Sequence, residues 1–386
     1  MEQVEGWSKD LKSFISMADV LFARPEARVN FADFIGCLLA AVPRKNGWQV
    51  AAHAGHATPD RQQNLLARAS WSADDLRDLV RETVVTHLGA DQGSEHAVLV
   101  VDETAALKAG RKSVGVGYQY AGITGQVENC QTMVMLTYAT CHGHAYIDRS
   151  LYLPASWTDD PERCREAGVP KDVGFATKPA LAVAMLRHTL AAGATGAVAA
   201  DSVYGRDPDF RKYCRDNELT YVLQVPSDLH VGFDEGRIRV DAVVGSLPEP
   251  ELLAWQRYSC GEGSKGLKYH DWAWIGGIDI DGGAADGFEY SLLIRRSISD
   301  PADTTYLLAH APVRTPLPQL IRIGGDRWAI EEDNRIGKNE IGLDHYEVRK
   351  WTSWHRHVTS CMFAAAFLAI TRAAELGKDK AEPDRD

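Results

Sequence analysis

Two short apolar runs, each closed by an aspartate, constrain the fold of this 386-residue chain more than any other feature. One is Ala-Val-Leu-Val-Val before Asp102, and the other is Ala-Val-Ala-Ala before Asp201. Short apolar runs of this length are typical of buried strands. We therefore expect two core strands, each with a carboxylate at its end.

A third carboxylate, Glu331, lies in a segment with a helical pattern. Arg327 precedes it by four residues and Lys338 follows it by seven, so a continuous helix would place all three on one face. Three acids with flanking cations are typical of metal-dependent phosphoryl transfer, because Mg²⁺ prefers oxygen ligands. The alternatives are solvated carboxylates, and cations that only pair with Glu331 along the helix.

Six segments, in order along nearly the whole chain, carry a resemblance to a known family. They are residues 100–104, 113–131, 151–160, 200–205, 327–338 and 342–349. In these segments the chain resembles the DDE transposases of bacterial insertion sequences, specifically the 701-like branch of the type 4 supergroup, within the RNase H-like superfamily. The family's helix motif has an aromatic residue, Arg, Glu and Lys. Arg327, Glu331 and Lys338 match it, whereas Gly324 stands at the aromatic position.

The resemblance implies an α/β fold, with an RNase H-like catalytic core, an antiparallel β insertion and a helical N-terminal domain. We expect the helical domain, which could bind DNA ends, over 1–92 and the core over 93–218 and 314–376. The β-strand insertion would span 219–313, and 377–386 would be a disordered tail. A first strand bearing an acid, further antiparallel strands, and then a helix and a strand that bears the second acid fit that order.

The sequence pattern also gives bounds for individual elements. Helices are expected over 28–41, 72–89, 176–192, 317–338 and 349–375. Strands are expected over 96–102, 114–124, 132–140, 145–153, 197–201, 221–225, 238–244, 254–260, 269–278, 288–295 and 305–311.

The same resemblance implies the chemistry. Asp102, Asp201 and Glu331 would be the catalytic residues and the ligands of two Mg²⁺ (or Mn²⁺) ions, with Asp102 and Asp201 sharing one ion. Glu103 and Glu332 are set aside because strand and helix geometry turns them away from their neighbours. DNA, both the terminal inverted repeats and the target, would be the substrate, and a homodimer would hold two ends in synapsis.

Further residues are candidates for DNA contact. Arg327 and Lys338 would bind phosphates beside the metals. Arg349, Lys350, Arg44 and Lys45 would bind phosphates elsewhere, although Arg44 and Lys45 also suit a solvated helix connection. Trp328 and Trp351 could stack on an unpaired base, although tryptophans at such spacings are more often core anchors.

Composition qualifies this interpretation. The chain carries 42 basic and 53 acidic residues, a net charge of −11, whereas DNA-binding proteins usually carry a basic excess. A domesticated descendant with a binding, regulatory or non-nucleic-acid enzymatic role is therefore the alternative. The pattern predicts no bilayer-spanning run and a cytoplasmic, nucleoid-associated protein. The seven scattered cysteines and the His53/His56, His142/His144 and His355/His357 pairs lack the spacing of a zinc site.

Overall fold

The computed structural model describes residues 2–89, 97–234, 236–247, 249, 253–263 and 266–381. The chain divides into two compact units. The first combines Met1–Ala90, Glu103–Thr177 and Ile330–Asp386, and the second combines Asp91–Asp102 and Lys178–Ala329. Neither unit is continuous in sequence, and the division falls within one strand, directly after Asp102.

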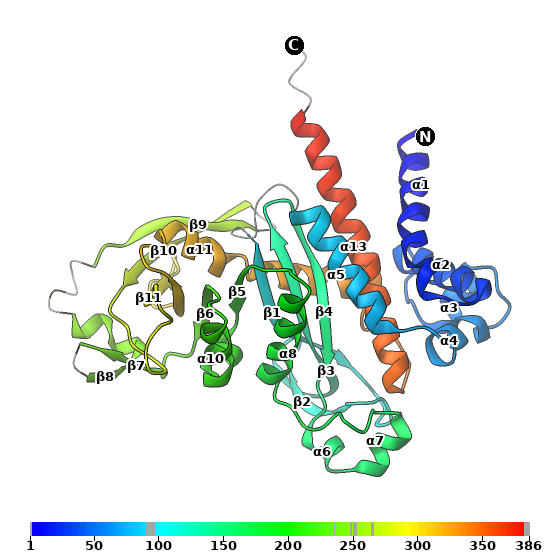
Figure 1. Cartoon of the computed structure of the whole chain (residues 1–386), viewed down its shortest axis with the longest axis horizontal. Coiled ribbons are helices and arrows are strands. Elements are labelled where there is room, and N and C mark those ends of the chain that lie inside the picture. The colour runs from blue at the N-terminus through cyan, green and yellow to red at the C-terminus, as the bar shows by residue number, and fades with distance from the viewer. Residues whose placement is uncertain are drawn as a thin grey trace. The chain divides into compact units, whose positions relative to one another are not determined.

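Antiparallel strands and helices form the first unit (Figure 1). Its strands are β1 (Val98–Leu107), of which Glu103–Leu107 belongs here, β2 (Gly117–Ala121), β3 (Gln126–Thr140) and β4 (Gly143–Leu151). Strand β3 has β1, β2 and β4 as its neighbours. The helices are α1 (Glu2–Ser16), α2 (Pro25–Leu39), α3 (Gly47–His53), α4 (Asp60–Ala67), α5 (Ala73–Gly89), α6 (Ala155–Thr158), α7 (Pro161–Ala167) and α13 (Trp351–Ala381), together with the 3₁₀ turn η1 (Met17–Leu21).

The helices at the two ends of the chain share one core in this unit. Phe31 of α2 lies 5.6 Å from Phe363 of α13, between ring centroids, and 5.9 Å from Trp71. The guanidinium of Arg356, on α13, donates to the backbone carbonyl of Trp71 at 2.6 Å. Helix α13 also packs along α5 and β4 (Figure 1). The N-terminal helices are therefore part of the same compact unit as the last helix.

Helix α13 extends further than its sequence pattern indicated. It continues through Ala381, whereas we expected a tail without regular structure from Gly377, and residues 382–386 lie outside the described part of the chain. By length and composition alone its segment Trp351–Gly377 could cross a membrane, but 56% of that window is buried inside the protein. Such burial is what a core helix of a globular unit shows.

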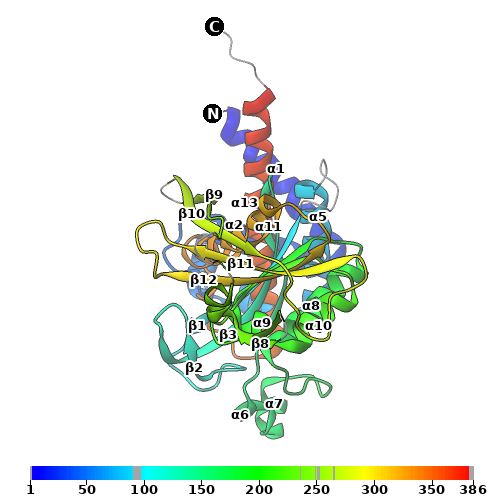
Figure 2. The same ribbon diagram turned by 90° about the vertical axis from the view of Figure 1, so that its left-hand side faces the viewer.

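The second unit is built on a mixed sheet in the order β1-β5-β6-β12-β11-β10-β9, and Figure 2 labels the strands β12, β11, β10 and β9. Strand β5 (Ala197–Ala200) pairs in parallel with both β1 and β6 (Tyr221–Val225). The strands β12 (Thr304–Pro312), β11 (Phe288–Arg296), β10 (Gly266–Ile275) and β9 (Gln256–Gly263) continue antiparallel. The antiparallel strands expected after Asp201 therefore extend the sheet that carries β5.

The remaining elements of this unit connect the strands. They are α8 (Lys178–Ala191), α9 (Ser202–Arg206), α10 (Pro208–Asp216), α11 (Leu317–Gly325), the hairpin β7 (His230–Phe233) and β8 (Gly236–Arg239), and the 3₁₀ turns η3 (Val240–Ala242) and η4 (Val244–Ser246). The strand expected over 238–244 is wrong, because β8 ends at Arg239 and the chain turns there into η3 and η4.

The helix expected over residues 317–338 is interrupted. Helix α11 ends at Gly325, a turn at Asp326 and Arg327 follows, and α12 covers Trp328–Ile336. A π-helix, η6, then spans Gly337–Ile341 and ends at Gly342, whose positive φ of 83° suits glycine. The prediction that one regular helix aligns Arg327, Glu331 and Lys338 is therefore wrong, because Arg327 lies in the turn and Lys338 in the π-helix.

Candidate active site

The aspartates that close the two apolar runs occupy neighbouring strands of the second unit. In the parallel pairing of β1 with β5, Val101 is the partner of Ala200, so Asp102 and Asp201 follow at the next position of each strand. Asp201 is still extended, with φ −80° and ψ −174°. Adjacent strands lie about 5 Å apart, so the backbone register places the two aspartates side by side.

The two strands differ in where they end. Strand β5 ends at Ala200, as the pattern predicted, whereas β1 continues through Asp102 to Leu107. The expectation that Asp102 closes its strand is therefore wrong. Asp102 instead occupies the position at which β1 loses β5 as its neighbour, and its side chain is 17% exposed. Because β5 no longer pairs with β1 at this position, a ligand can reach the carboxylate of Asp102 while Asp102 stays in its strand.

Asp201 has a second role in its local structure. Its carboxylate caps α9 by accepting a hydrogen bond from the backbone N–H of Val203 at 2.9 Å. The rest of the Ala-Asp-Ser-Val-Tyr-Gly motif supports this turn. Tyr204 is fully buried, and a Cβ at Gly205 would lie 2.0 Å from the carbonyl oxygen of Gln224. Only glycine allows α9 to approach β6 this closely.

Arg327 is one cation that lies close to Asp102. Its Nη1 lies 3.5 Å from Oδ2 of Asp102, and the Arg327 side chain is 28% exposed. The alternative in which Arg327 pairs with Glu331 stays open. A guanidinium beside a carboxylate balances its charge, and its planar fork of N–H donors also matches the geometry of a phosphate group.

Glu331 belongs to α12 in the first unit, and its side chain is exposed while the preceding Ile330 is fully buried. The buried acid of this helix is Asp333, two residues later. Its carboxylate accepts a hydrogen bond from the Thr137 hydroxyl at 2.7 Å and lies 2.8 Å from Nδ1 of His144. The helix is therefore held by Asp333, which leaves Glu331 on the outer face.

A second contact holds the same helix. The hydroxyl of Tyr146, in β4, donates to Oδ1 of Asn334 at 2.7 Å. Burial lowers the pKa of His144, but the charge and hydrogen bond of Asp333 outweigh burial and raise it above its ordinary value. Together, the contacts of His144, Thr137 and Tyr146 anchor α12 to β3 and β4. Our reading of the sequence missed this support, although an acid two positions after Glu331 was a usable signal.

Lys338 is bound to the strand that carries Asp102. Its ammonium donates to the backbone carbonyl of Ala105 at 2.8 Å, and burial lowers its pKa. Gly324, which stands at the family's aromatic position, is buried, and a Cβ there would lie 3.1 Å from both Leu307 and Val222. An aromatic side chain has no room at that position in this structure.

The other residues proposed for DNA contact fall into different environments. Lys45 is 3% exposed, and its ammonium donates to the backbone carbonyls of Leu38, at 2.5 Å, and Glu340. Burial lowers its pKa. The expectation of a phosphate contact by Lys45 is therefore wrong, because its ammonium is enclosed. Arg44 is exposed.

Arg349 and Lys350 are both exposed, and the ammonium of Lys350 donates to the backbone carbonyl of Glu166. Trp328 and Trp351 are half-buried, and the ring of Trp351 lies 4.3 Å from that of His355. A half-buried tryptophan that already contacts a neighbouring ring has less surface for base stacking.

The carboxylates of this site are oxygen donors of the kind that a divalent metal ion prefers. Among the described residues, no three His, Cys, Asp or Glu side chains gather as a metal site. The pair Asp102 and Asp201 still suits Mg²⁺, which is commonly held by one or two carboxylates, with water and substrate phosphates completing its six oxygen ligands. Cys37, Cys130, Cys141, Cys164, Cys214 and Cys361 form no disulfide bonds.

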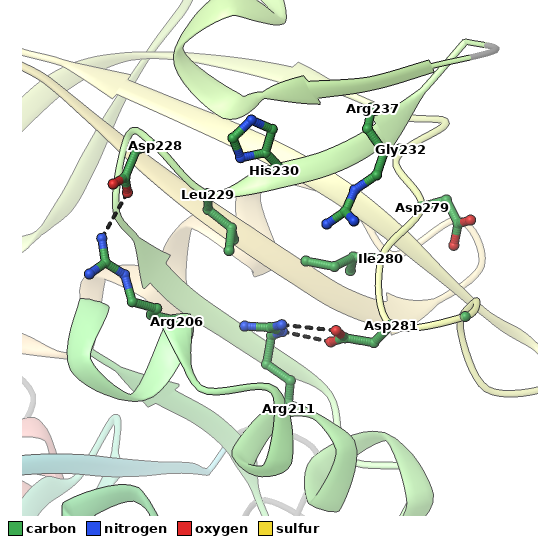
Figure 3. Close-up of a pocket in the computed structure, with 11 residues that line it drawn as sticks. Arg206, Arg211, Asp228, Leu229, His230, Gly232, Arg237, Asp279, Ile280 and Asp281 are labelled. Atoms are coloured by element: carbon green, nitrogen blue, oxygen red, sulfur yellow. Dashed lines mark hydrogen bonds and ion pairs between the residues drawn. The ribbon is translucent and has the colours of Figure 1, made fainter.

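A separate pocket of about 650 Å³ lies in the second unit (Figure 3). It is lined by Arg206 at the end of α9, Arg211, and residues of the β7–β8 hairpin and the 279–282 loop. Both helix arginines are neutralised. Arg211 makes a bidentate contact with Asp281 at 2.6 and 2.9 Å, and Arg206 lies 2.7 Å from Asp228. The pocket therefore has little excess positive charge to attract a phosphate.

Comparison with known proteins identifies the chain's relatives. Residues 20–240 match the family model described as DDE superfamily endonuclease, a range that includes Asp102 and Asp201 and ends before Glu331. No curated protein matches the chain. The matched range covers more than half of the 386 residues, and the mixed α/β architecture agrees with an RNase H-like core. The chain thus belongs to the DDE superfamily of endonucleases, which supports DNA cleavage of the nuclease or transposase type.

Proposed function

We propose that this protein is a transposase of the 701-like branch, which cleaves DNA at the ends of an insertion sequence and joins those ends to a target. The observation that carries the proposal is the pairing of Val101 with Ala200, which sets Asp102 and Asp201 side by side within the matched family region. Glu331 is proposed as the third acid, because it is the exposed carboxylate on a helix that is held by other side chains.

The carboxylates of Asp102, Asp201 and Glu331 are proposed to hold two Mg²⁺ ions. Bound there, the ions would supply charge stabilisation to the phosphodiester and activate the attacking hydroxyl of water or of a DNA 3′ end. The chain's own contribution is placement. The strand register aligns two acids, and the cap on α9 keeps the carboxylate of Asp201 oriented.

Arg327 and Lys338 are proposed to act on the DNA backbone. Arg327 lies 3.5 Å from Asp102, and a guanidinium at that position has the planar donor geometry that suits a phosphate oxygen. Lys338 donates to Ala105, so it is also able to fix β1 near the acid. Two element ends must be brought together for transposition, which favours a homodimer on DNA.

The proposal can be tested with linear DNA that carries the inverted repeats flanking the coding region. We expect strand cuts and joined products with the intact protein in Mg²⁺ and none in EDTA. Asp102→Asn should abolish both products. Glu103→Gln is the matched control, because its side chain lies on the opposite face of the same strand.

Three outcomes separate the possibilities. Cleavage by Asp102→Asn at the parent rate contradicts the assignment of the site. Cuts without joined products retain an endonuclease and remove strand transfer. Binding of the repeats without cleavage in Mg²⁺ or Mn²⁺ supports a domesticated protein with a regulatory role, which the net charge of −11 favours.

A further inference from the structure

Three exposed cations of the first unit are not used by its ion pairs. They are Arg111 and Lys112, in the loop after β1, and Arg349, just before α13. Among the described residues, these three side chains form no ion pair and no side-chain hydrogen bond. Arg77 and Arg335, by contrast, are each paired with acidic side chains. In a chain with a net charge of −11, a group of unpaired cations creates a local positive potential that favours an anionic partner.

Backbone contacts hold these cations together. The N–H of Val114 donates to the carbonyl oxygen of Arg349 at 3.0 Å, which joins the two segments. Nη2 of Arg163 donates to the carbonyl oxygen of Arg111 at 2.9 Å, and the Arg163 guanidinium lies 3.8 Å from the ring centroid of Trp157. The cations thus stand on a fixed frame, so binding a ligand there costs little backbone ordering.

The same loop is anchored at its other end. The Lys108 ammonium donates to the carbonyl oxygen of Tyr346 at 2.8 Å and lies 3.6 Å from the centre of that ring. The amide of Asn129, in β3, donates to the carbonyl oxygens of Lys108 and, at 3.0 Å, Gly110. Asn129 therefore fixes the loop beside one face of the β2–β3 pair.

Two exposed tyrosines share that face. Tyr118 is the cross-strand partner of Asn129, and Tyr120 is the partner of Val127. Partners in an antiparallel pair, and residues two apart on one strand, point to the same side. Tyr118, Tyr120 and Val127 are 71%, 63% and 64% exposed. We call the face formed by these three side chains the tyrosine ribbon, and residues 111–112 with Arg349 the basic loop.

Charge and shape indicate which partner fits. Phosphates neutralise unpaired arginines and lysines, and exposed aromatic rings stack on unpaired bases without sequence preference. A second copy of this chain, placed face to face in a symmetric dimer, would instead bring the same cations against each other. A nucleic acid with a single-stranded part satisfies both the basic loop and the tyrosine ribbon.

We propose that the basic loop and the tyrosine ribbon bind a single-stranded segment of the DNA substrate, with phosphates at Arg111, Lys112 and Arg349 and bases on Tyr118 and Tyr120. The proposal rests on the proposed function, because it assumes that DNA is the substrate. It adds a binding surface that the acids, Arg327 and Lys338 do not contribute to.

The experiment measures binding of the full chain in EDTA to two fluorescent probes, a blunt duplex and the same duplex with an oligothymidine overhang. Arg111→Ala/Lys112→Ala should weaken binding of the overhang probe about tenfold and reduce the salt slope by about 1.4, for two lost contacts on a single strand. We expect the parent protein to bind the overhang probe at least about fivefold more tightly than the blunt duplex. Tyr118→Ala/Tyr120→Ala should abolish this preference and leave the salt dependence of binding unchanged. Tyr118→Phe/Tyr120→Phe should bind like the parent protein.

Lys212→Ala is the control for charge removal, since Lys212 is an exposed lysine paired with Asp216. If both double variants bind like this control while the parent protein cleaves DNA, the surface inference is wrong and the proposed function stands. A tyrosine variant that changes only the oligomeric state also overturns it, in favour of an interface between copies. If the parent protein binds the overhang probe through this surface but never cleaves, the proposed function is at fault instead.

Discussion

The acids of the second unit and the acid of the first are positioned by different forces. Asp102 and Asp201 are aligned by backbone pairing, because Val101 and Ala200 are register partners. Glu331 lies on a helix that is tied down by side chains, mainly through Asp333 to Thr137 and His144. Backbone hydrogen bonds persist when a nearby side chain is changed, whereas a buried polar contact is lost with either partner. The first arrangement should therefore tolerate substitutions that the second does not.

The largest effect is expected at Asp201, where capping and chemistry can be separated. Asp201→Asn and Asp201→Ala should both lower the cleavage rate by about a thousandfold or more, because neither supplies the carboxylate that a metal needs. Only Ala should lower the free energy of unfolding, by about 1 kcal/mol, because Asn can still accept the bond from Val203. Single-turnover cleavage and urea titration measure the two effects. Cleavage by the Asn variant at the parent rate would remove Asp201 from the site.

The next prediction compares the two arrangements directly. Asp333→Ala should lower the free energy of unfolding by about 3 kcal/mol, since it leaves His144 and the Thr137 hydroxyl without their buried acceptor. It should also lower the cleavage rate of the folded protein. Val101→Ala, at a fully buried position beside Asp102, should cost about 1–3 kcal/mol but leave that rate close to the parent value.

The control for Asp333→Ala and Val101→Ala is the folded fraction of each variant, measured by circular dichroism at the assay temperature. Equal losses of cleavage in the two variants, after correction for folding, would contradict the distinction between backbone and side-chain placement.

A smaller effect is expected at Thr137. Thr137→Val keeps the shape of the side chain but removes the hydroxyl that donates to Asp333 at 2.7 Å. We expect a loss of about 1–2 kcal/mol in the free energy of unfolding, since the ion pair with His144 persists. Denaturant titration measures this free energy. Thr158→Val is the matched control, because Thr158 is a half-buried threonine far from α12 in sequence. A loss as large as that of Asp333→Ala would mean that the hydroxyl carries the whole anchor.

The smallest effect is a pH dependence. The pKa of His144 is raised in the folded state, because Asp333 outweighs burial. Its stabilisation is therefore fully present below the unfolded histidine's pKa of about 6.5 and is lost as the pH rises through the higher folded value. The stability difference between the parent protein and His144→Gln should fall as the pH rises above about 6.5. A difference that does not change with pH would show that the ion pair does not depend on protonation.

The contrast between backbone and side-chain placement also explains what the sequence could reveal. The alternation and length of the apolar runs predicted β5, most of β11 and β12, and the core helix α8, because local pattern determines such elements. The bounds of α5 were predicted to within one residue, and the N–H of Asp75 donates to the Ser72 hydroxyl at 3.1 Å where the helix begins.

The remainder depends on contacts between distant residues. Nothing local distinguishes Lys45 from an exposed lysine, and it becomes buried only when Glu340 supplies a carbonyl 295 positions away. The interruption at Arg327 and the π-helix after Ile336 were likewise not predicted from the helical pattern. The support of α12 was missed for the same reason, because Thr137 and His144 lie far from Asp333 in sequence.

The division of β1 between the two units also affects how the chain is made. Val98 emerges from the ribosome 99 residues before Ala197, its partner in β5. At about 5–20 residues per second, the strand that carries the first acid exists for roughly 5–20 seconds before its parallel neighbour is synthesised. During that interval the apolar stretch Val98–Val101, which is fully buried in the folded protein, cannot pair with β5. Slow synthesis would therefore prolong, and chaperone binding would limit, the exposure of the same residues that later align the two acids.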